Sequence, residues 1–592
     1  MVKLAHGGDL IAYALQKHGV KYMFTLTGGH ISPILTGAEK LGIEVVDVRH
    51  EATAVFAADA VSRLSGIPGV AVVTAGPGVT NTITPLKNAQ MAQSPLILFG
   101  GATALVLKNR GSLQDIDQHS IVKSMVKWSI TIKRLKEIPA KVSEAFFRAQ
   151  SGVPGPVFIE VPIDVLYPEH LVREMYGIDK IKGNGMAQRL TRWYLTRTLN
   201  KIFGEADYNP EITIRRPEVK KAPTSKLIQA ATLLSEAKKP LVIAGSQLVQ
   251  NHKLLQKTRK IIEELSIPIY LSGMARGMLG RESQIQFRHK RREAIKNADV
   301  ILLLGVPLDF RLDYGRLFKR SSKVISINRS VKDLKLNKDL RGVDLPILGD
   351  PAEGLIRLSE LLHSIRTEES YLSSEGVKHD WLKELENNEA KRNEEIDRMS
   401  KEKSEKVNPL FLCKLMDEHI PDNSILIGDG GDFIATFSYI VKPRAPLSWL
   451  DPGVFGTLGS GGGFALGAKK VFPDKHVFLI YGDGSFGYSL AEWDTFVRHG
   501  IPVFGLIGND AQWAQIAREQ TELLGSGIAT GLVPTKYEKA VEGLGAKGYR
   551  IETDKEVEQT LEAAIGSLKE GNPVLVNAII SKSDFRKGSL SM

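Results

Sequence analysis

Residues 481–510 read YGDGSFGYSLAEWDTFVRHGIPVFGLIGND and predict two buried strands joined by a helix. The first strand, residues 477–481, runs into the glycine turn at 482–485, and the second, residues 503–507, ends at Asn509 and Asp510. The carboxyl ends of parallel strands meet at the edge of the sheet where ligands bind. Oxygen side chains beside glycine-rich backbone suit a Mg²⁺ ion that carries a diphosphate. An ordinary strand–helix–strand unit with a glycine turn fits these letters equally well, so the rest of the chain has to decide.

Outside this stretch, strand and helix patterns alternate in three regions. The expected strands fall at 22–26, 44–48, 70–73, 95–99 and 156–161, then at 240–244, 267–271, 300–304 and 324–327, and then at 424–427. Such alternation implies parallel sheets covered by helices on both faces. We therefore predict an α/β protein with three doubly wound parallel-sheet domains. We expect domains at 1–168, 223–365 and 407–592, a linker with an amphipathic helix at 169–222, and a charged linker at 366–406, which we interpret as a solvated helix.

The helix of the first linker has an apolar face among basic residues. The apolar side chains are Leu190, Trp193, Tyr194, Leu195, Leu199, Ile202 and Phe203, and the basic ones are Arg189, Arg192, Arg197 and Lys201. A membrane-surface helix is one interpretation. A helix packed on its own protein is the interpretation that we favour.

Composition narrows the classes of protein and partner. The 592 residues are 43% hydrophobic and 24% charged, which is typical of a globular chain with large cores. One cysteine, Cys413, excludes a disulfide framework and a cysteine-based metal cluster, and we expect it to be a core residue in a cytoplasmic protein. The sequence shows no signal peptide or membrane span. A net charge of +11 favours anionic partners, but no nucleic-acid-binding motif is present, so we expect an anionic small molecule instead.

Four further stretches carry possible chemistry. Glu51 follows a strand and opens an alanine-rich helix, where a buried carboxyl could share a proton with a ring nitrogen; a helix N-terminal acid stabilised by the dipole is the plainer alternative. GPGVTN at 76–81 predicts a tight turn that lets a ligand approach the backbone, with Asn81 as a hydrogen-bonding group. GTLGSGGG at 456–463 and GDGGD at 428–432 are glycine turns of the same kind.

Together these motifs resemble the thiamin-diphosphate enzymes of the acetolactate synthase type. RHEATAVFAADA around Glu51, the GPGVTN turn, GTLGSGGGFALGA and GDGS followed by Asn509–Asp510 occur in the order of that family and span essentially the whole chain. Stretches such as LDPGVFGTLG and FGYSLAEWDTFVRH place the resemblance nearest to the branch of 2-hydroxyacyl-CoA lyases.

The resemblance implies thiamin diphosphate and Mg²⁺ as cofactors. Glu51 would contact N1′ of the aminopyrimidine, and Gln114 matches a glutamine that reaches the active site. Acetolactate synthases have a phenylalanine before that glutamine, where this chain has Leu113, a departure that argues against pyruvate chemistry. The implied cofactor-binding residues are Gly28, Gly29, Pro77, Asn81, Gly431, Asp432, Gly456, Leu458, Gly484 and Ser485.

The implied metal ligands are Asp483, Asp510 and the backbone carbonyl of Gln512. Most of the family has two asparagines where this chain has Asn509 and Asp510, and the extra carboxylate is still a suitable Mg²⁺ ligand.

The reaction that we expect is cleavage of a 2-hydroxyacyl-CoA to formyl-CoA and an aldehyde one carbon shorter. The alternatives are acetolactate synthase, with FAD in the central domain, and a regulator of the same fold without activity; FAD or ADP in that domain stays open. The basic residues Arg288, Lys290, Arg291 and Arg292 are the candidates for binding the CoA phosphates, and residues 585–588 are expected to close over the site. The resemblance also implies a homodimer or homotetramer with active sites between subunits.

Overall fold

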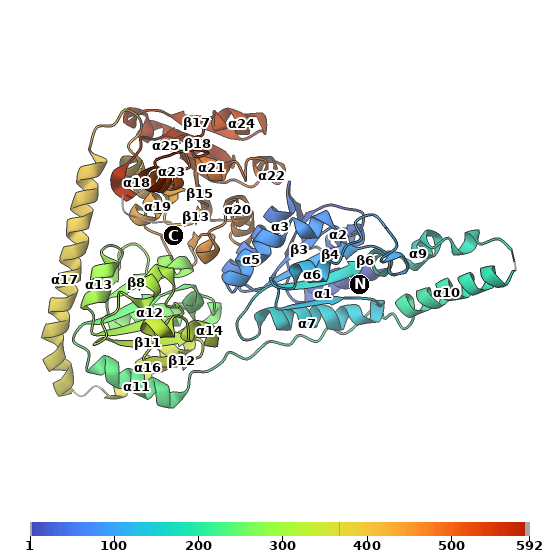
Figure 1. Ribbon diagram of the computed structural model, residues 1–592, viewed down its shortest axis with the longest axis horizontal. Coiled ribbons are helices and arrows are strands. Elements are labelled where there is room, and N and C mark those ends of the chain that lie inside the picture. The colour runs from blue at the N-terminus through green and yellow to red at the C-terminus, as the bar shows by residue number, and fades with distance from the viewer. Residues whose placement is uncertain (1–2, 184, 366–367, 587–592) are drawn as a thin grey trace. The chain divides into compact units, whose positions relative to one another are not determined.

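A computed structural model describes residues 3–183, 185–365 and 368–586, with the backbone alone for 368–378. Within these ranges, the strands form three six-stranded parallel sheets, each covered by helices (Figure 1). The predicted fold class, α/β with three doubly wound sheets, is confirmed.

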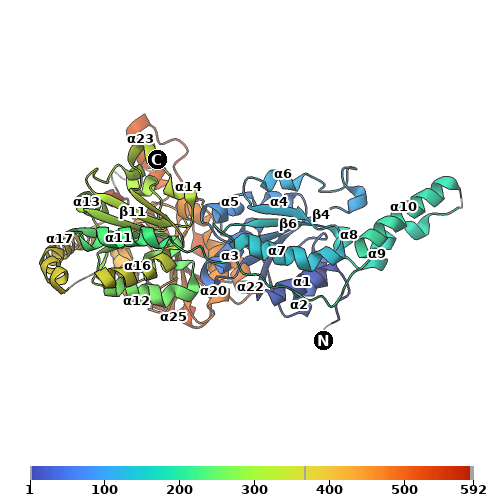
Figure 2. The ribbon, with the colours of Figure 1, turned by 90° about the horizontal axis from the view of Figure 1, so that it is seen from below.

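The first sheet has the strand order β2-β1-β3-β4-β6-β5. Its strands are β1 (Tyr22–Leu26), β2 (Glu44–Asp47), β3 (Gly69–Val73), β4 (Leu96–Ala102), β5 (Trp128–Thr131) and β6 (Val157–Pro162). Its helices are α1 (Gly7–Lys17), α2 (Ser32–Lys40), α3 (Glu51–Ser65), α4 (Pro77–Thr80), α5 (Ile83–Met91), α6 (Gln118–Val122), α7 (Ile138–Gln150), α8 (Ile163–Leu166), α9 (Glu169–Met175) and α10 (Met186–Phe203). Figure 2 shows α1 and α2 below the strands and α4 and α6 above them. The reversal of strand order beside β1 and β3 is the kind of edge at which such sheets bind ligands.

The second sheet has the order β12-β11-β10-β7-β8-β9. Its strands are β7 (Pro240–Ala244), β8 (Ile269–Leu271), β9 (Gln286–Phe287), β10 (Val300–Leu304), β11 (Lys323–Asn328) and β12 (Leu345–Leu348). Its helices are α11 (Thr224–Ser235), α12 (Leu255–Leu265), α13 (Arg291–Asn297), α14 (Val331–Leu334), α15 (Lys338–Arg341), α16 (Pro351–Ile365) and α17 (Glu368–Ser400).

The third sheet has the order β14-β13-β15-β16-β18-β17. Its strands are β13 (Ser424–Gly428), β14 (Trp449–Leu450), β15 (His476–Gly482), β16 (Phe504–Asn509), β17 (Lys547–Ile551) and β18 (Val574–Ile579). Its helices are α18 (Pro409–His419), α19 (Asp432–Ile440), α20 (Gly461–Val471), α21 (Asp483–Phe486), α22 (Glu492–Arg498), α23 (Ala514–Leu524), α24 (Tyr537–Gly543) and α25 (Val557–Lys569).

Short 3₁₀ helices connect these elements. They are η1 (Leu105–Leu107), η2 (Leu135–Glu137), η3 (Ile178–Lys180), η4 (Ser246–Val249), η5 (His252–Leu254), η6 (Gly273–Gly277), η7 (Phe310–Gly315), η8 (Gly453–Phe455), η9 (Asp554–Glu556) and η10 (Asp584–Arg586).

The chain divides into two compact units. The first comprises residues 1–217 with 453–472, and the second comprises 218–452 with 473–592. The segment 453–472 belongs to the first unit because α20 packs along α3. The central sheet and the third sheet share the second unit.

The structure adds strands that the sequence patterns did not reveal. Five of them, β5, β9, β12, β14 and β17, are the edge strands of their sheets. Edge strands are short and partly exposed, as the half-buried β5 shows, so they lack the continuous apolar run of a central parallel strand. The sixth, β18, is a fully buried central strand.

Two linker helices differ from their expected surroundings. The side chains of Trp381 and Leu385 on α17 are buried against the central domain, and the Trp381 indole donates to the carbonyl of Pro240 at 2.9 Å, so the prediction of a solvated helix was wrong for this face. A spacing of four residues places both side chains on one side of the helix.

The α10 helix is partly packed. Leu199, Ile202 and Phe203 join the core of the first sheet, as expected, whereas Leu190 and Trp193 are exposed. In the part of the chain that is described, we find no helix long and apolar enough to cross a membrane.

Candidate active site

Glu51 is the first residue of α3 and is buried. Its carboxylate accepts a hydrogen bond from the side-chain amide of Asn81 at 2.9 Å. The ring of His50 caps the helix by accepting from the backbone N–H of Ala52. Glu51 and Asn81, 30 positions apart in the sequence, are thus brought together as one polar pair.

The glycine turn that begins α4 lies against the Gln114 loop. Gly76 has a φ of 62°, and a Cβ there would lie 2.9 Å from Cβ of Gln114, so only glycine fits. Pro77, the next residue, is exposed, and Gln114 is half-buried. Gly28 lies close to the same edge, because a Cβ there would be 2.5 Å from the side chain of Thr74, after β3. Gly29, by contrast, has open space around it, and its carbonyl accepts from the hydroxyl of Tyr167 at 2.9 Å.

The segment 453–472 adds a second glycine-rich stretch to the first unit. The 3₁₀ helix η8 packs on α5, and the following Gly456 has a φ of 65° with no described atom within 4 Å of where a Cβ would lie. Leu458 is half-buried. Gly463 of α20 touches α3, because a Cβ there would lie 2.5 Å from Cβ of Phe56.

Asp483 and Asp510 follow adjacent strands of the third sheet. Gly482 of β15 is in register with Gly508 of β16, so both strands end at the same edge. One carboxylate oxygen of Asp483 accepts from the backbone N–H of Gly484 at 2.9 Å, while the other, Oδ2, is buried without a hydrogen-bond partner among the described atoms.

Asn509 is engaged inside the third domain. Its side-chain amide donates to Asn577 at 3.1 Å, and its oxygen accepts from the backbone N–H of Ala511 at 3.2 Å. Asp510, the next residue, is half-buried at the sheet edge. The geometry therefore favours Asp510 over Asn509 as a metal ligand.

The two carboxyl groups oppose each other's ionisation. Burial raises the pKa of Asp483 to about 6. Burial, followed by the negative charges of Asp483 and Asp432, raises the pKa of Asp510 to about 7. A divalent cation between them would neutralise this repulsion.

Two glycine turns interlock beside these carboxylates. Gly431 has a φ of 114°, and a Cβ there would lie 3.1 Å from Cα of Gly482. The hydroxyl of Ser485 donates to the carbonyl of Gly430 at 2.8 Å, so this hydroxyl joins the two turns. The carboxylate of Asp432 pairs with Arg518 at 2.6 Å. The backbone N–H of Asp432 lies in the first turn of α19, where N–H groups have no partner within the helix and can bind a phosphate.

A strongly basic pocket of about 560 Å³ lies within the second unit. Its walls carry three aromatic rings and a single carboxylate, that of Glu293, beside seven basic side chains. The basic residues are Arg276, Arg288, Lys290, Arg291, Arg292, Arg392 and Arg586, and the rings are Tyr270, Phe287 and Tyr439.

All four predicted CoA-binding residues line this pocket, although the expectation that they open a helix was only partly right. The helix α13 begins at Arg291, so Arg288 and Lys290 precede it. The Arg288 guanidinium donates to the carbonyls of Val441 at 2.6 Å and Ser438 at 3.1 Å. Burial, and then the neighbouring Arg276, lowers its pKa to about 10.

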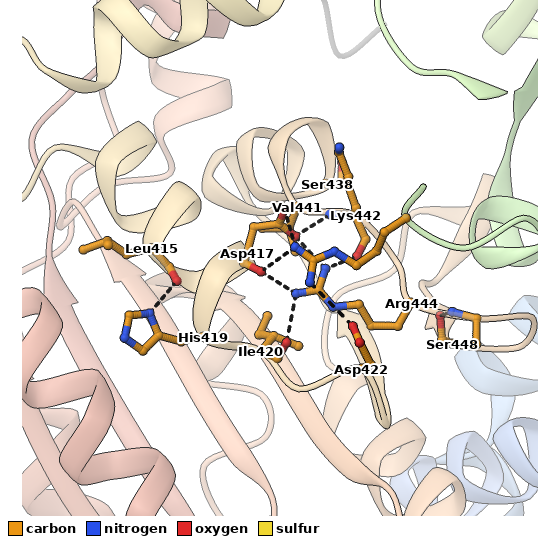
Figure 3. Close-up of polar contacts among 12 residues, drawn as sticks. Leu415, Asp417, His419, Ile420, Asp422, Ser438, Val441, Lys442, Arg444 and Ser448 are labelled. Atoms are coloured by element: carbon orange, nitrogen blue, oxygen red, sulfur yellow. Dashed lines mark hydrogen bonds and ion pairs between the residues drawn. The ribbon is translucent and has the colours of Figure 1, made fainter. Parts of the chain in front are cut away.

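The segment that supplies these carbonyls is held by Arg444. Its guanidinium donates to the carboxylate of Asp417 at 2.6 Å and to the carbonyl of Ile420 at 3.1 Å, as Figure 3 shows. The backbone N–H of Lys442 donates to the same carboxylate at 2.9 Å. These bonds fix the chain after α19 on α18, which keeps the wall of the pocket in place.

The described end of the chain reaches the same pocket. The ring of Phe585 meets that of Tyr439 edge-on at 5.5 Å, and the guanidinium of Arg392 lies 4.8 Å above Phe585. Arg586 lines the pocket, and its carbonyl accepts from Arg518 at 3.0 Å. Lys587 and Gly588, which were expected to help close the site, lie outside the described residues. A single helix, α19, thus joins the turn at Asp432 to the pocket wall at Tyr439.

The matches to known protein families fall on the same three regions of the chain as the three sheets. Models of the thiamine pyrophosphate enzymes match the N-terminal TPP binding domain at residues 5–121, the central domain at 227–358 and the C-terminal TPP binding domain at 429–578. The chain belongs to the thiamine pyrophosphate (TPP, or thiamin diphosphate) enzyme family.

Relatives that match nearly the whole chain include proteins with two kinds of name. The chain is 47% identical to 2-hydroxyacyl-CoA lyase 2 of Danio rerio, over 99% of this chain and 93% of the relative. It is 46% identical to the human protein of that name, over 99% and 92%. It is also 32% identical to an acetolactate synthase large subunit of Mycobacterium tuberculosis, over 98% and 96%.

The residues of the structure fit the cofactor of a TPP enzyme. The partnerless oxygen of Asp483 and the raised pKa of Asp510 suit a divalent cation. The two glycine turns interlock at Gly431 and Gly482, and Gly431 is exposed; glycine-rich backbone of this kind binds phosphate groups. Glu51 is a buried carboxylate, a group that can share a proton with a ring nitrogen.

Two groups that shape these turns are absent from the expectations. Gln118 accepts from the backbone N–H of Gly76 at 3.0 Å and donates to Glu160 at 2.9 Å. Burial disfavours the charged form of Glu160, but His119 and the hydrogen bonds from Gln118 and Thr131 hold its pKa at about 2. The ring of Trp513 packs against Gly484, because a Cβ on Gly484 would lie 2.5 Å from atoms of that ring. Sequence spacing carries no signal for these contacts, because each joins distant segments.

Proposed function

We propose that this TPP enzyme is a carbon–carbon lyase that cleaves a 2-hydroxyacyl-CoA to formyl-CoA and an aldehyde one carbon shorter. The names of relatives that are 46% and 47% identical over 99% of the chain support the reaction class. The observation that supports a CoA ester as the substrate is the pocket with seven basic side chains, because CoA contains several phosphate groups.

For the cofactor, we propose that the first unit holds the aminopyrimidine. Glu51 would hold or release a proton shared with N1′, and the amide of Asn81 keeps its carboxylate oriented. Gln114 would reach the reacting groups. The lining residues would be Gly28, Gly29, Pro77, Asn81, Gly456 and Leu458. When bound, TPP supplies the carbanion chemistry, and the protein supplies orientation.

For the diphosphate and its metal ion, we propose Mg²⁺ bound by Asp483, Asp510 and the carbonyl of Gln512. Backbone N–H groups at Gly431, Asp432, Gly484 and Ser485 would bind the diphosphate. The raised pKa values of the two aspartates support this assignment, since ionised carboxylates side by side favour a cation.

The metal assignment is tested by Asp483→Asn and Asp510→Asn. The first removes the negative charge of the more deeply buried carboxylate and puts an amide NH₂ in place of one of its two oxygens, and it should weaken Mg²⁺-dependent TPP binding by roughly ten- to a hundredfold. The second keeps a ligand oxygen and lowers the negative charge, so binding should persist. Quenching of tryptophan fluorescence during a Mg²⁺ titration measures both, because Trp513 touches Gly484. Asp494→Asn, in α22, is the control, and the reverse order of the two effects would contradict the assignment.

For the substrate, we propose that Arg288, Lys290, Arg291 and Arg292 bind the CoA phosphates with the other basic side chains of the pocket. The acyl end would extend along α19 toward the diphosphate turn, because that helix joins the two. In the reaction, the C1–C2 bond breaks and its electron pair stays on C1, which gains a proton. The hydroxyl proton of C2 is lost as the aldehyde forms.

The deciding assay offers a panel of 2-hydroxyacyl-CoA esters, and separately pyruvate, to the protein with TPP and Mg²⁺. Mass spectrometry should find formyl-CoA and the shortened aldehyde. Acetolactate from pyruvate without formyl-CoA would support the second candidate, acetolactate synthase, which the 32% identical relative favours. Yellow colour from bound FAD, as opposed to colourless ADP or CoA, would point the same way.

The pocket is tested by Lys290→Ala with Arg292→Ala, two exposed side chains. The KM for the acyl-CoA should rise by about tenfold or more with little change in kcat, since a charge-assisted hydrogen bond contributes about 1.5–3 kcal/mol. Lys257→Ala with Lys260→Ala, on α12, is the matched control. An unchanged KM would show that CoA does not bind in this pocket, and it would leave the assignment of the TPP site unaffected.

A further inference from the structure

The helix α10 has two apolar faces, of which the first unit buries one. Together with α9 it extends beyond the first sheet, as Figures 1 and 2 show. Its buried face carries Leu199, Ile202 and Phe203 in the core of that sheet, with Leu195 packed beside them. This contact holds the C-terminal half of α10 in place.

The opposite face of α10 is apolar and exposed. Met186, Leu190, Trp193 and Tyr194 are 82%, 58%, 57% and 52% exposed. At about 3.6 residues per turn these positions lie on one side of the helix. Large apolar side chains gathered on a surface mark an interaction site. We call these four residues the α10 face.

The charged residues of α10 itself all have one sign. Residues 185–203 contain three arginines, Arg189, Arg192 and Arg197, with Lys201, and no aspartate or glutamate. Arg189, Arg197 and Lys201 are exposed. The guanidinium of Arg197 lies 5.1 Å above the ring of Trp193, so the cationic and aromatic groups are adjacent. Arg192 differs, because it donates to the carbonyl of Ile181 at 2.9 Å.

We propose that the α10 face binds the surface of an anionic lipid bilayer, with the helix lying in the plane of the interface. Tryptophan and tyrosine combine an apolar body with a polar tip that suits this interface, and long basic side chains reach the headgroups from its edge. A helix with aromatic and aliphatic residues among cations is the pattern of such surface binding. Negatively charged headgroups complement the uniform positive charge.

Two other occupants fit the α10 face less well. A second copy of the chain would bring Arg189, Arg197 and Lys201 against their own equivalents, with no acidic residue on the helix to neutralise them. Single-stranded nucleic acid needs aromatic platforms for its bases, and the aliphatic Met186 and Leu190 provide none.

The test is sedimentation of the purified full chain with vesicles of phosphatidylcholine, with or without phosphatidylserine. We expect binding only when phosphatidylserine is present, and a decrease as salt is added. Arg189→Glu with Arg197→Glu and Lys201→Glu should weaken binding by at least about tenfold. Leu190→Ala with Trp193→Ala should also weaken it, and neither set touches the buried face, so thermal melting should stay unchanged.

The matched control, Lys257→Glu with Lys260→Glu and Lys332→Glu, changes the net charge equally on other helices. Equal loss of binding in this control would overturn the proposal, since it would show attraction by net charge alone. Wild-type binding by the α10 variants, or no binding by the wild-type chain, would also overturn it. A smaller native mass after Leu190→Ala with Trp193→Ala would also overturn the proposal, because it would place the α10 face between copies of the chain. If the α10 variants lost binding to RNA and not binding to vesicles, the proposal would fail as well.

Discussion

At the scale of single residues, Glu51 and the pair Asp483–Asp510 show how the fold prepares carboxyl groups for different tasks. Glu51 is buried with one directed donor, Asn81. Asp483 and Asp510 follow adjacent strands at one sheet edge, and burial raises the pKa of both carboxyl groups, with the charge of Asp483 adding to the effect on Asp510. Carboxyl groups in one chain thus differ in chemistry because their neighbours differ.

The first prediction concerns Glu51. Glu51→Gln keeps the size of the side chain and removes its ability to exchange a proton. We expect turnover to fall by roughly a hundredfold to ten-thousandfold, with the melting temperature unchanged. The control is Glu44→Gln, an exposed carboxylate on β2. Turnover at the wild-type level in the Glu51 variant would rule out proton transfer by this residue.

The second prediction concerns pH and the buried His289. Burial, and then the positive charges of Arg288, Arg392 and Lys442, lowers its pKa to about 3, against the raising effect of Asn393. Its ring lies tilted against that of Tyr439, with the ring centroids 4.5 Å apart. The nearby Glu389 carboxyl has a raised pKa because it is buried, so its effect has the opposite sign. The folded state therefore disfavours protonation of His289, and its contribution to stability falls as the pH drops below about 6.5.

The measurement compares His289→Phe with the wild-type chain. The wild-type melting temperature should fall more than that of the variant between about pH 7 and about pH 5, by an amount corresponding to on the order of a kcal/mol or more. Parallel curves for the two proteins would show that the pKa of His289 is the same in the folded and unfolded states.

At the scale of elements, close helix packing depends on glycine. Gly463 and Gly467 of α20 lie directly on α3, and a Cβ on Gly467 would be 2.3 Å from the carbonyl oxygen of Ala57. The helix α3 begins with Glu51, so this packing also fixes the position of that carboxylate.

The third prediction follows from this contact. Gly463→Ala should lower the free energy of unfolding by about 1–3 kcal/mol, because the new methyl group overlaps Phe56 and Thr53. The matched control is Gly566→Ala in α25, where a Cβ meets no described atom within 4 Å. There the change should stabilise by about 0.4–1 kcal/mol. Chemical denaturation measures both, and a stabilising Gly463→Ala would show that the two helices are not in close contact.

At the scale of the whole molecule, the proposed groups lie in different compact units. Glu51, Asn81 and Leu458 belong to the first unit, whereas Asp483, Asp510 and the basic pocket belong to the second. The proposed active site between subunits would combine Glu51 of one chain with Asp483 of another.

The fourth prediction tests that assembly. At a TPP concentration too low to fill the Asp483→Asn variant, Glu51→Gln and Asp483→Asn chains should each have little activity alone. If each site uses both chains, a hybrid dimer contains one site with both native carboxylates. Random exchange of subunits should then restore roughly a quarter of the wild-type activity. No recovery after verified exchange would place both groups in one chain.

Sequence patterns alone determined the class of the fold and most of its central strands. A parallel strand buried on both faces needs a continuous apolar run, as in β7 and β10, and that run is legible in one dimension. Edge strands such as β9 were not predicted, because a strand of two residues is too short to show a periodic pattern in the sequence. The motifs around Glu51, Gly76 and Asp483 also stood out, since glycine turns after strands have their own composition.

Only the tertiary structure decided which groups meet. It joined Glu51 to Asn81 and Gln118 to the turn at Gly76, contacts between segments that no local pattern relates. It separated Asn509, held by Asn577, from Asp510 at the sheet edge. It also divided α10 into a buried and an exposed apolar face, because periodicity shows that a side chain is apolar but not whether anything packs against it.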